Sequence, residues 1–138
     1  DRLVFQAGNT IEDGSKAALQ LINEGNPATA IYAVTDLVAI GCAEALLAQG
    51  IEIPREMSLV GYGNFLVAEH YRVPLTTVRQ PKFTLGQAAM DLMVRLLRGE
   101  KVQSKRLPTE LVIRASTAQS PTTPCLVNAG TRPAKVEA

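Results

Sequence analysis

Apolar runs separated by amphipathic stretches dominate the first 80 residues of the chain. The run 30–34 is wholly apolar and partly β-branched, which is typical of a strand that is covered on both faces. Short apolar segments at 2–6, 58–62 and 76–79 predict further strands, and 107–114 is a candidate for the last strand.

Helical patterns fill the gaps between these strands. The first predicted helix begins at a capping pair formed by Thr10 and Asp13, and its apolar positions then follow at helical spacing. Residues 37–49 are apolar nearly all round, which predicts a buried helix that Gly50 ends. Residues 65–71 predict a short helical segment.

A longer helix is predicted over 81–98, because Pro81 suits the first turn of a helix and Gly99 can end it. Asp91 and Arg95 are four residues apart and are predicted to pair on its polar side. Its apolar face consists of Leu85, Ala88, Ala89, Leu92 and Leu96.

Strands that alternate with helices predict βαβ units and a parallel sheet. Three polar segments follow the predicted strands directly: Gly8-Asn9-Thr10, Thr35-Asp36 and Gly63-Asn64. Because open parallel sheets bind ligands at the carboxyl ends of their strands, we expect these segments to share one edge. Their hydroxyls, amides and single carboxylate suit a polyhydroxylated or amide-bearing small molecule.

Composition narrows the possible functions. Hydrophobic residues make up 46% and charged residues 20% of the chain, and the net charge is +1 with no basic block. A nucleic-acid-binding surface is therefore not expected in this segment, and no apolar stretch is long enough for a membrane span. Cys42 lies in an apolar run and Cys125 in a Pro-rich tail, which indicates a reducing, cytoplasmic setting rather than a disulfide framework.

The sequence contains only incomplete versions of the motifs that bind nucleotides or metals or that carry out catalysis. The pattern that begins at Gly61-Tyr62-Gly63 lacks its last glycine, because Leu66 stands there, and Gly14-Ser15-Lys16 has Lys after Ser rather than after Gly. His70 is the only histidine, and it has no companion at metal-ligand spacing. We therefore expect no enzyme, no cofactor and no metal site. A fragment of an α/β enzyme is a rival that a Cys–His pair in a cleft would revive.

Several phrases, in order and with matching spacing over residues 8–118, together resemble the sensor domains of LacI/GalR-family transcription regulators. The clearest is Pro74-Leu75-Thr76-Thr77-Val78-Arg79-Gln80-Pro81, followed by Leu85-Gly86-Gln87-Ala88-Ala89. The others are Thr35-Asp36-Leu37-Val38-Ala39-Ile40-Gly41, Ile53-Pro54-Arg55-Glu56-Met57-Ser58-Leu59-Val60-Gly61-Tyr62 and Leu107-Pro108-Thr109-Glu110-Leu111-Val112-Ile113-Arg114.

This resemblance implies a fold and a division of the chain. The fold class is α/β, a Rossmann-like parallel sheet with helices on both faces, as in a truncated lobe of a type I periplasmic-binding-protein-like domain. Residues 1–118 would be a sensor fragment: 1–80 most of the C-terminal lobe, 81–106 a segment of the N-terminal lobe and 107–118 a return strand. Residues 119–138 would be a tail. The apolar face of helix 81–98 would need a substitute partner, such as a second copy or the tail.

The resemblance also implies an effector site made of Asn9, Thr10, Thr35, Asp36, Gly63, Asn64 and Gln80. Asn9 stands where many relatives have a stacking aromatic ring, and Gly63 stands where an Asp usually grips hydroxyls or amines. Either the effector is therefore unlike the family's usual sugars or none binds. Structural roles are open as well, because Asp36 could be a helix N-cap, Asn9 and Thr10 could be turn residues, and Gln80 could bind backbone in the hinge.

The implied function is small-molecule sensing by a repressor that acts through lobe closure and dimerisation. His70 and Tyr71 are the expected homodimer contacts, with an ordinary surface pair as the alternative, and DNA would be bound only through an N-terminal head outside this chain. Neither DNA nor a membrane is an expected partner of the segment itself. A periplasmic-type solute-binding protein is the alternative function, and a piece with no ligand function of its own is a further one.

Overall fold

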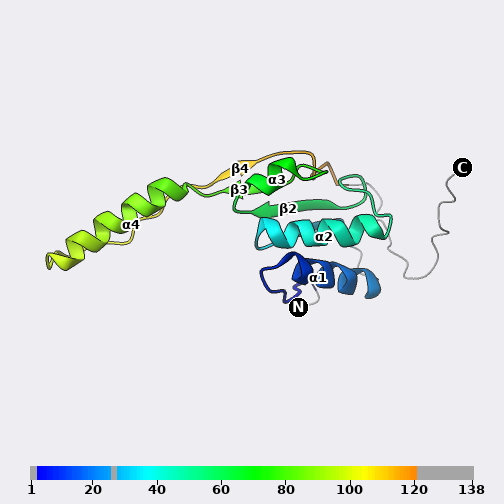
Figure 1. The fold of residues 1–138 in the computed structure, drawn as a ribbon, viewed down its shortest axis with the longest axis horizontal. Coiled ribbons are helices and arrows are strands. Elements are labelled where there is room, and N and C mark those ends of the chain that lie inside the picture. The colour runs from blue at the N-terminus through cyan, green and yellow to red at the C-terminus, as the bar shows by residue number, and fades with distance from the viewer. Residues whose placement is uncertain (1–2, 26–27, 121–138) are drawn as a thin grey trace, which may run out of the picture.

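The computed structural model describes residues 3–25 and 28–120 (Figure 1). They form one four-stranded sheet in the order β1-β2-β3-β4. β1, β2 and β3 run parallel, and β4 pairs antiparallel with β3. In chain order the elements are α1 (Ile11–Asn23), β1 (Ala30–Tyr32), α2 (Asp36–Ala48), β2 (Ser58–Tyr62), α3 (Leu66–His70), β3 (Thr76–Arg79), α4 (Lys82–Leu97) and β4 (Glu110–Val112). The predicted α/β sheet is confirmed, and β1 to β3 are parallel as predicted, whereas β4 is antiparallel.

Two strand predictions were wrong. Residues 3–6 form no strand, and Leu3 and Val4 are exposed. β1 is the edge strand of the described sheet, and it is covered on one face only: Ala30 and Tyr32 are exposed, and Ile31 turns toward the core. An apolar run without alternation does not distinguish an edge strand from a central one, because the run itself carries no information about its neighbours.

The first two helices pack tightly against each other because glycines line their contact. The Thr10 capping box is present as predicted, with the Asp13 amide donating to the Thr10 hydroxyl and the Asp13 carboxylate accepting from the Thr10 amide. A side-chain carbon at Gly14 would meet the carbonyl of Val38, and one at Gly41 would meet the carbonyl of Ile11. The two helix backbones therefore approach each other directly.

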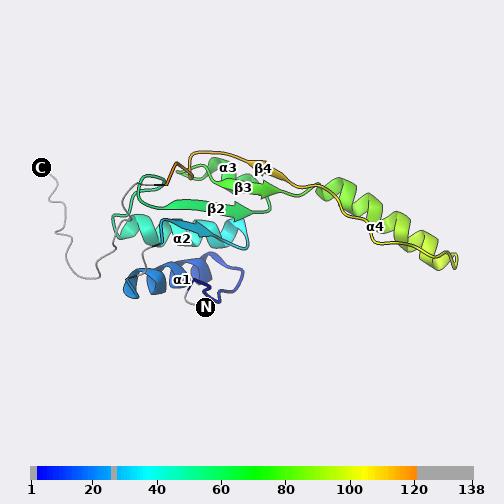
Figure 2. The same ribbon diagram turned by 180° about the vertical axis from the view of Figure 1, so that it is seen from behind.

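The core lies between these helices and the sheet. α2 is the central helix, with nine buried residues along its length, and it lies between α1 and β2 (Figures 1 and 2). Burial of this helix confirms its sequence prediction. One cluster joins α2 to β2 and α3 and includes Val38, Leu59 and Ala68, and a second joins α1 to α2 and includes Leu21, Leu46 and Met57.

The helices cover one face of the sheet only. Leu59 and Ala68 share the cluster on the α2 side, so α1, α2 and α3 all lie on that side of β2. Alternate residues of paired strands turn to the opposite face, where Tyr32, Val60 and Tyr62 are exposed or half-buried. The expected helices on both faces are therefore found on one face within the part of the chain that the structure describes.

α4 projects away from the sheet, and a return segment runs back beside it to β4 (Figure 1). None of its residues is buried, and Arg95 pairs with Glu100 at 2.9 Å, where the sequence had predicted Asp91. The last strand, Glu110–Val112, is shorter than the predicted 107–114. Because α4 stands clear of the strands beyond its first turn, Arg95 pairs with the return segment, and only Lys82, at the start of the helix, lies against the rest of the described fold, over the Phe65 ring.

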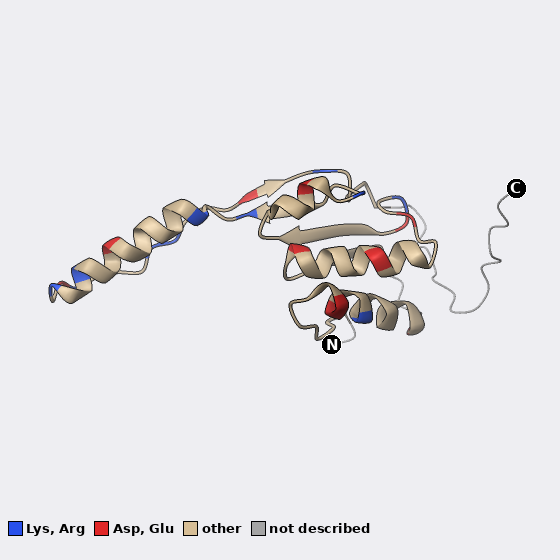
Figure 3. Cartoon of the chain, in the orientation of Figure 1, with Lys and Arg blue, Asp and Glu red and all other residues tan. Residues whose placement is uncertain are grey.

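Acidic and basic residues are interspersed along the described ribbon (Figure 3). The sequence likewise predicted a surface on which Lys and Arg form no cluster. No described helix is both long enough and apolar enough to cross a membrane.

Candidate functional site

Asp36 is the centre of a group of polar residues at the carboxyl ends of β1 and β2. It is fully buried, and its carboxylate accepts hydrogen bonds from the Phe65 amide at 2.7 Å and from the Thr77 hydroxyl at 2.5 Å. These bonds tie the start of α2 to the turn after β2 and to β3. The predicted N-cap role was misplaced by one residue, because Thr35 is the N-cap and accepts from the Val38 amide at 3.2 Å.

The turn after β2 contains Gly63 and Asn64, which both have positive φ angles, of 123° and 48°. The Asn64 amide donates to the Thr77 hydroxyl at 3.3 Å, and the Asn64 side-chain oxygen accepts from the Arg114 guanidinium at 2.9 Å. Because Thr77 also bonds Asp36, these neighbours hold the turn in one geometry.

Asn9 and Thr10 reach the same end of the molecule by a different route from the predicted one. They follow no strand, but they precede α1, and α1 and α2 begin at the same end of the fold (Figure 1). Both residues are exposed, and the Thr10 side chain is used by the capping box. Helix packing therefore brings these residues toward the carboxyl ends of the strands.

Gln80 lies where the chain leaves β3 for α4. Its side-chain amide donates to the Tyr62 hydroxyl at 2.9 Å, so its partner is a side chain of β2 rather than hinge backbone. We use the term polar edge for the set at this end of the sheet. It comprises Asn9, Thr10, Thr35, Asp36, Gly63, Asn64 and Gln80.

Sequence reasoning missed the residues that hold the polar edge together. Thr77 and Tyr62 were seen only as strand residues, although Thr77 alternates onto the face that α2 covers. Arg114, far along the chain, donates to the Leu75 carbonyl as well as to Asn64. Knowledge of how β3 pairs with β2 could have placed Thr77 beside Asp36. No local sequence pattern, however, links residue 114 to residue 64.

The comparisons with known proteins agree with this geometry. A family model described as a periplasmic binding protein-like domain matches residues 2–117. The chain belongs to this family. Among curated relatives, the HTH-type transcriptional repressor CytR of Escherichia coli strain K12 is 35% identical over 114 residues, which are 81% of this chain and 33% of the repressor.

Solved structures of LacI-type regulators share the fold of this periplasmic binding protein-like chain. A LacI family transcriptional regulator from Enterococcus faecium with bound ribose has a TM-score of 0.71 at 33% identity, covering 81% of this chain and 42% of that one. The lac repressor dimer bound to operator and the anti-inducer ONPF has a TM-score of 0.75 at 32% identity, covering 80% and 39%. The resemblance to LacI/GalR regulators is thereby confirmed. The chain spans about a third of the length of the curated relatives it matches.

The expected dimer contacts of this LacI-type chain lie at the end of α3. His70 is exposed, while Tyr71 is half-buried and donates from its hydroxyl to Glu44 at 2.7 Å. Burial, together with that hydrogen bond, raises the pKa of Tyr71 above its usual value. Tyr71 therefore also anchors the end of α3 to α2, and only part of its ring is available to a partner.

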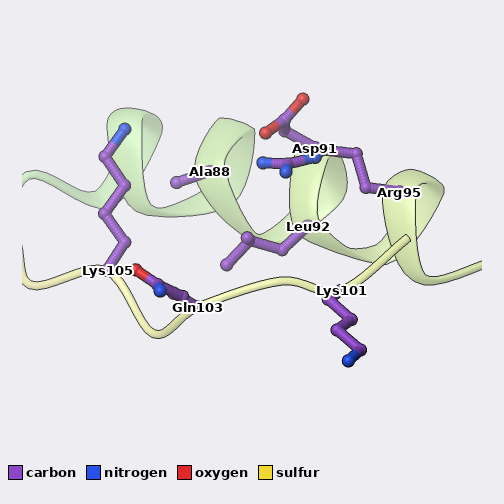
Figure 4. A pocket seen from close by; sticks show the side chains of 7 residues that line it. All are labelled: Ala88, Asp91, Leu92, Arg95, Lys101, Gln103 and Lys105. Carbon is purple, nitrogen blue, oxygen red and sulfur yellow. The ribbon is translucent and has the colours of Figure 1, made fainter.

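A cavity of about 390 Å³ lies away from the polar edge, between α4 and its return segment. Its lining includes Asp91, Leu92 and Arg95 from the helix. The Leu92 side chain points toward the return segment, whereas the Lys101 side chain, on that segment, points away from the helix (Figure 4). No polar-edge residue lines it. In the described residues no three His, Cys, Asp or Glu side chains are grouped as metal ligands.

Proposed function

We propose that this chain is part of the effector-sensing domain of a bacterial DNA-binding transcription regulator, a repressor. The observation that carries the proposal is the meeting of Thr35-Asp36, Gly63-Asn64 and Gln80 at the carboxyl ends of parallel strands. That edge is where open α/β sheets bind small molecules. Because the related proteins are transcription regulators, regulation is favoured over solute transport and over catalysis.

In this proposal the chain divides at Gln80. Residues 1–80 form most of one lobe, 81–106 belong to the other lobe, 107–118 return to the first, and 119–138 are a tail of which only 119–120 lie within the described residues. The projection of α4 from the sheet supports this division. The proposed effector contacts are the exposed or half-buried members of the polar edge, namely Asn9, Thr10, Thr35, Asn64 and Gln80, with Asp36 and Gly63 shaping the site beneath them.

The proposed partners are a polar small molecule and a second copy of the protein. His70 and the free part of Tyr71 would contact that copy. DNA would be bound by an N-terminal head domain, and the regulator would act in the cytoplasm. Bound effector would shift the equilibrium between two relative orientations of the lobes. The size of that shift is limited by the difference in the effector's affinity for the two orientations.

Isothermal calorimetry on the full-length regulator tests the sensor role, with panels of sugars, nucleosides and amino acids. We expect saturable heat from at least one compound, and we expect that compound to change the affinity for operator DNA in a mobility-shift assay. Asn64→Ala removes a polar-edge side chain and should weaken binding about tenfold. Asn23→Ala, at the far end of α1, is the matched control. Absence of heat from every panel would overturn the proposal.

A further inference from the structure

A cation and an aromatic ring lie together beside the polar edge. The Nζ atom of Lys82 lies 4.4 Å from the centre of the Phe65 ring. Phe65 follows the Gly63-Asn64 turn, and Lys82 is the first residue of α4, two positions after Gln80. The pair therefore joins the turn after β2 to the start of α4, next to the proposed effector contacts.

The acidic side chains near this place are already used. Both oxygens of Asp36 accept hydrogen bonds inside the fold, and Asp13 accepts from the amide and hydroxyl of Thr10. The Arg114 guanidinium donates to Asn64 in the same turn and to the Leu75 carbonyl just before β3, and it pairs with Glu69 of α3 at 3.4 Å. Across residues 3–25 and 28–120, Lys82 forms no ion pair. The uncommitted charge beside the polar edge is therefore positive.

The turn itself cannot supply a compensating carboxylate. Gly63 has φ 123°, which side-chain-bearing residues rarely adopt, and a carbon added there would lie 3.3 Å from the Phe65 ring. The ring occupies the space that an acidic side chain at this position would need. Phe65 is 40% exposed, so its ring still borders solvent beside the ammonium.

A ring holds an ammonium without neutralising it. The attraction comes from the electron-rich face of the ring, while the three N–H donors of the lysine remain able to bind an anion. A carboxylate would have taken up the charge, as Glu110 does for Arg79 at 3.1 Å. Phe65 therefore positions Lys82 and leaves its charge available.

We infer that the effector of this chain is an anionic small molecule, carrying a carboxylate or a phosphate group that Lys82 binds above Phe65. The neutral polar part of the molecule lies along Asn64 and Gln80. This inference rests on the proposed sensor function, and it names the ligand class for that site. Charge complementarity decides the class, because the structure offers this position a cation and no free acid.

The test is calorimetry on the full-length protein with matched neutral and anionic probes: ribose and ribose 5-phosphate, glucose and glucose 6-phosphate, and gluconate. We expect at least one anionic probe to bind at least tenfold more tightly than its neutral counterpart. The phosphate and carboxylate arms separate the two sources of charge. Lys82→Met, which keeps the length of the side chain, should weaken anionic binding about tenfold or more and leave neutral binding unchanged. Phe65→Leu should weaken anionic binding less.

Lys101→Met is the control, because Lys101 is an exposed lysine far from the polar edge and should change nothing. If an anionic probe binds wild type and Lys82→Met equally, the inference is wrong. If only neutral probes bind, the inference is wrong and the sensor function stands. If no probe of either class and no compound in the wider panels binds, both fail.

Discussion

At the scale of single residues, the fold depends on one buried carboxylate. Asp36 is fully buried, no Lys or Arg among the described residues pairs with it, and its two hydrogen bonds connect the start of α2 to Phe65 and Thr77. A buried charge is tolerated when hydrogen bonds satisfy it, and it becomes costly when they are lost. The same residue can therefore shape the polar edge and hold three elements together.

Asp36→Ala should lower the free energy of unfolding by about 2–4 kcal/mol, because the buried Thr77 hydroxyl and the partly buried Phe65 amide both lose their acceptor. Asp36→Asn should cost less, since its oxygen can accept from Phe65 while its amide donates to the Thr77 hydroxyl. Urea unfolding of both variants shows which substitution lowers the free energy of unfolding more. Equal losses for Ala and Asn would show that the hydrogen bonds contribute little, and Asp91→Ala on exposed α4 serves as control.

Cys42 gives a prediction about pH. Burial raises the pKa of its thiol from 9.0 to about 11. A raised pKa in the folded state means that the stabilising contribution is complete below about pH 9 and is lost as pH rises toward about 11. Between about pH 8 and about pH 10, the free energy of unfolding should fall by about 1 kcal/mol more in wild type than in Cys42→Ala. Denaturant titrations at both pH values check this, and parallel pH profiles for the two proteins would contradict it.

At the scale of elements, the contact between α1 and α2 has no room for side chains at its two glycines. Gly41→Ala would push a methyl group against the Ile11 carbonyl, so we expect a loss of about 1–3 kcal/mol in unfolding free energy. Gly86→Ala is the matched control, because Gly86 also lies within a helix and has nothing within 4 Å of the added carbon. It should stabilise by about 0.5–1 kcal/mol. Thermal and urea unfolding compare the two, and equal shifts would rule out close packing as the cause.

Local patterns in the sequence predicted the elements well, because caps, glycine stops and apolar periodicity act within a few residues. The Thr10 capping box, buried α2 and the strand Ser58–Tyr62 all follow from such signals. Properties that depend on neighbours did not follow. The edge position of β1 depends on what lies beside it in space, and the bond from Arg114 to Asn64 joins residues 50 positions apart. Strand ends could be located from the sequence, so that the turns after β1 and β2 were named in advance, whereas the hydrogen bonds that hold those turns could not.

Across the whole molecule, the helices differ in how much of each is buried against the rest of the fold. The helices α1 to α3 share buried clusters with the sheet, while α4 has no buried residue. Its exposed apolar side chains are Phe83, Leu85, Met90, Met93, Val94, Leu96 and Leu97. Phe83, Met90, Met93, Val94 and Leu97 share one side of α4 at helical spacing, whereas Leu85 and Leu96 lie on the opposite side. An exposed apolar helix face of this kind favours association with another surface in water.

We therefore expect the 138-residue chain, purified alone, to self-associate through α4 as its concentration rises. Light scattering during gel filtration should give a mass above that of one chain at about 100 μM, since burying several such side chains contributes roughly 1.5–3 kcal/mol each. The double variant Met93→Glu and Leu97→Lys should shift the mass toward one chain, because each charge would have to be buried on association. Leu3→Lys, at an exposed position outside α3 and α4, is the control for loss of apolar surface elsewhere, and it should leave the α4 contact intact. If wild type stays at the mass of one chain at that concentration, α4 is stable in water without a partner, and its apolar face then requires no cover from a second lobe.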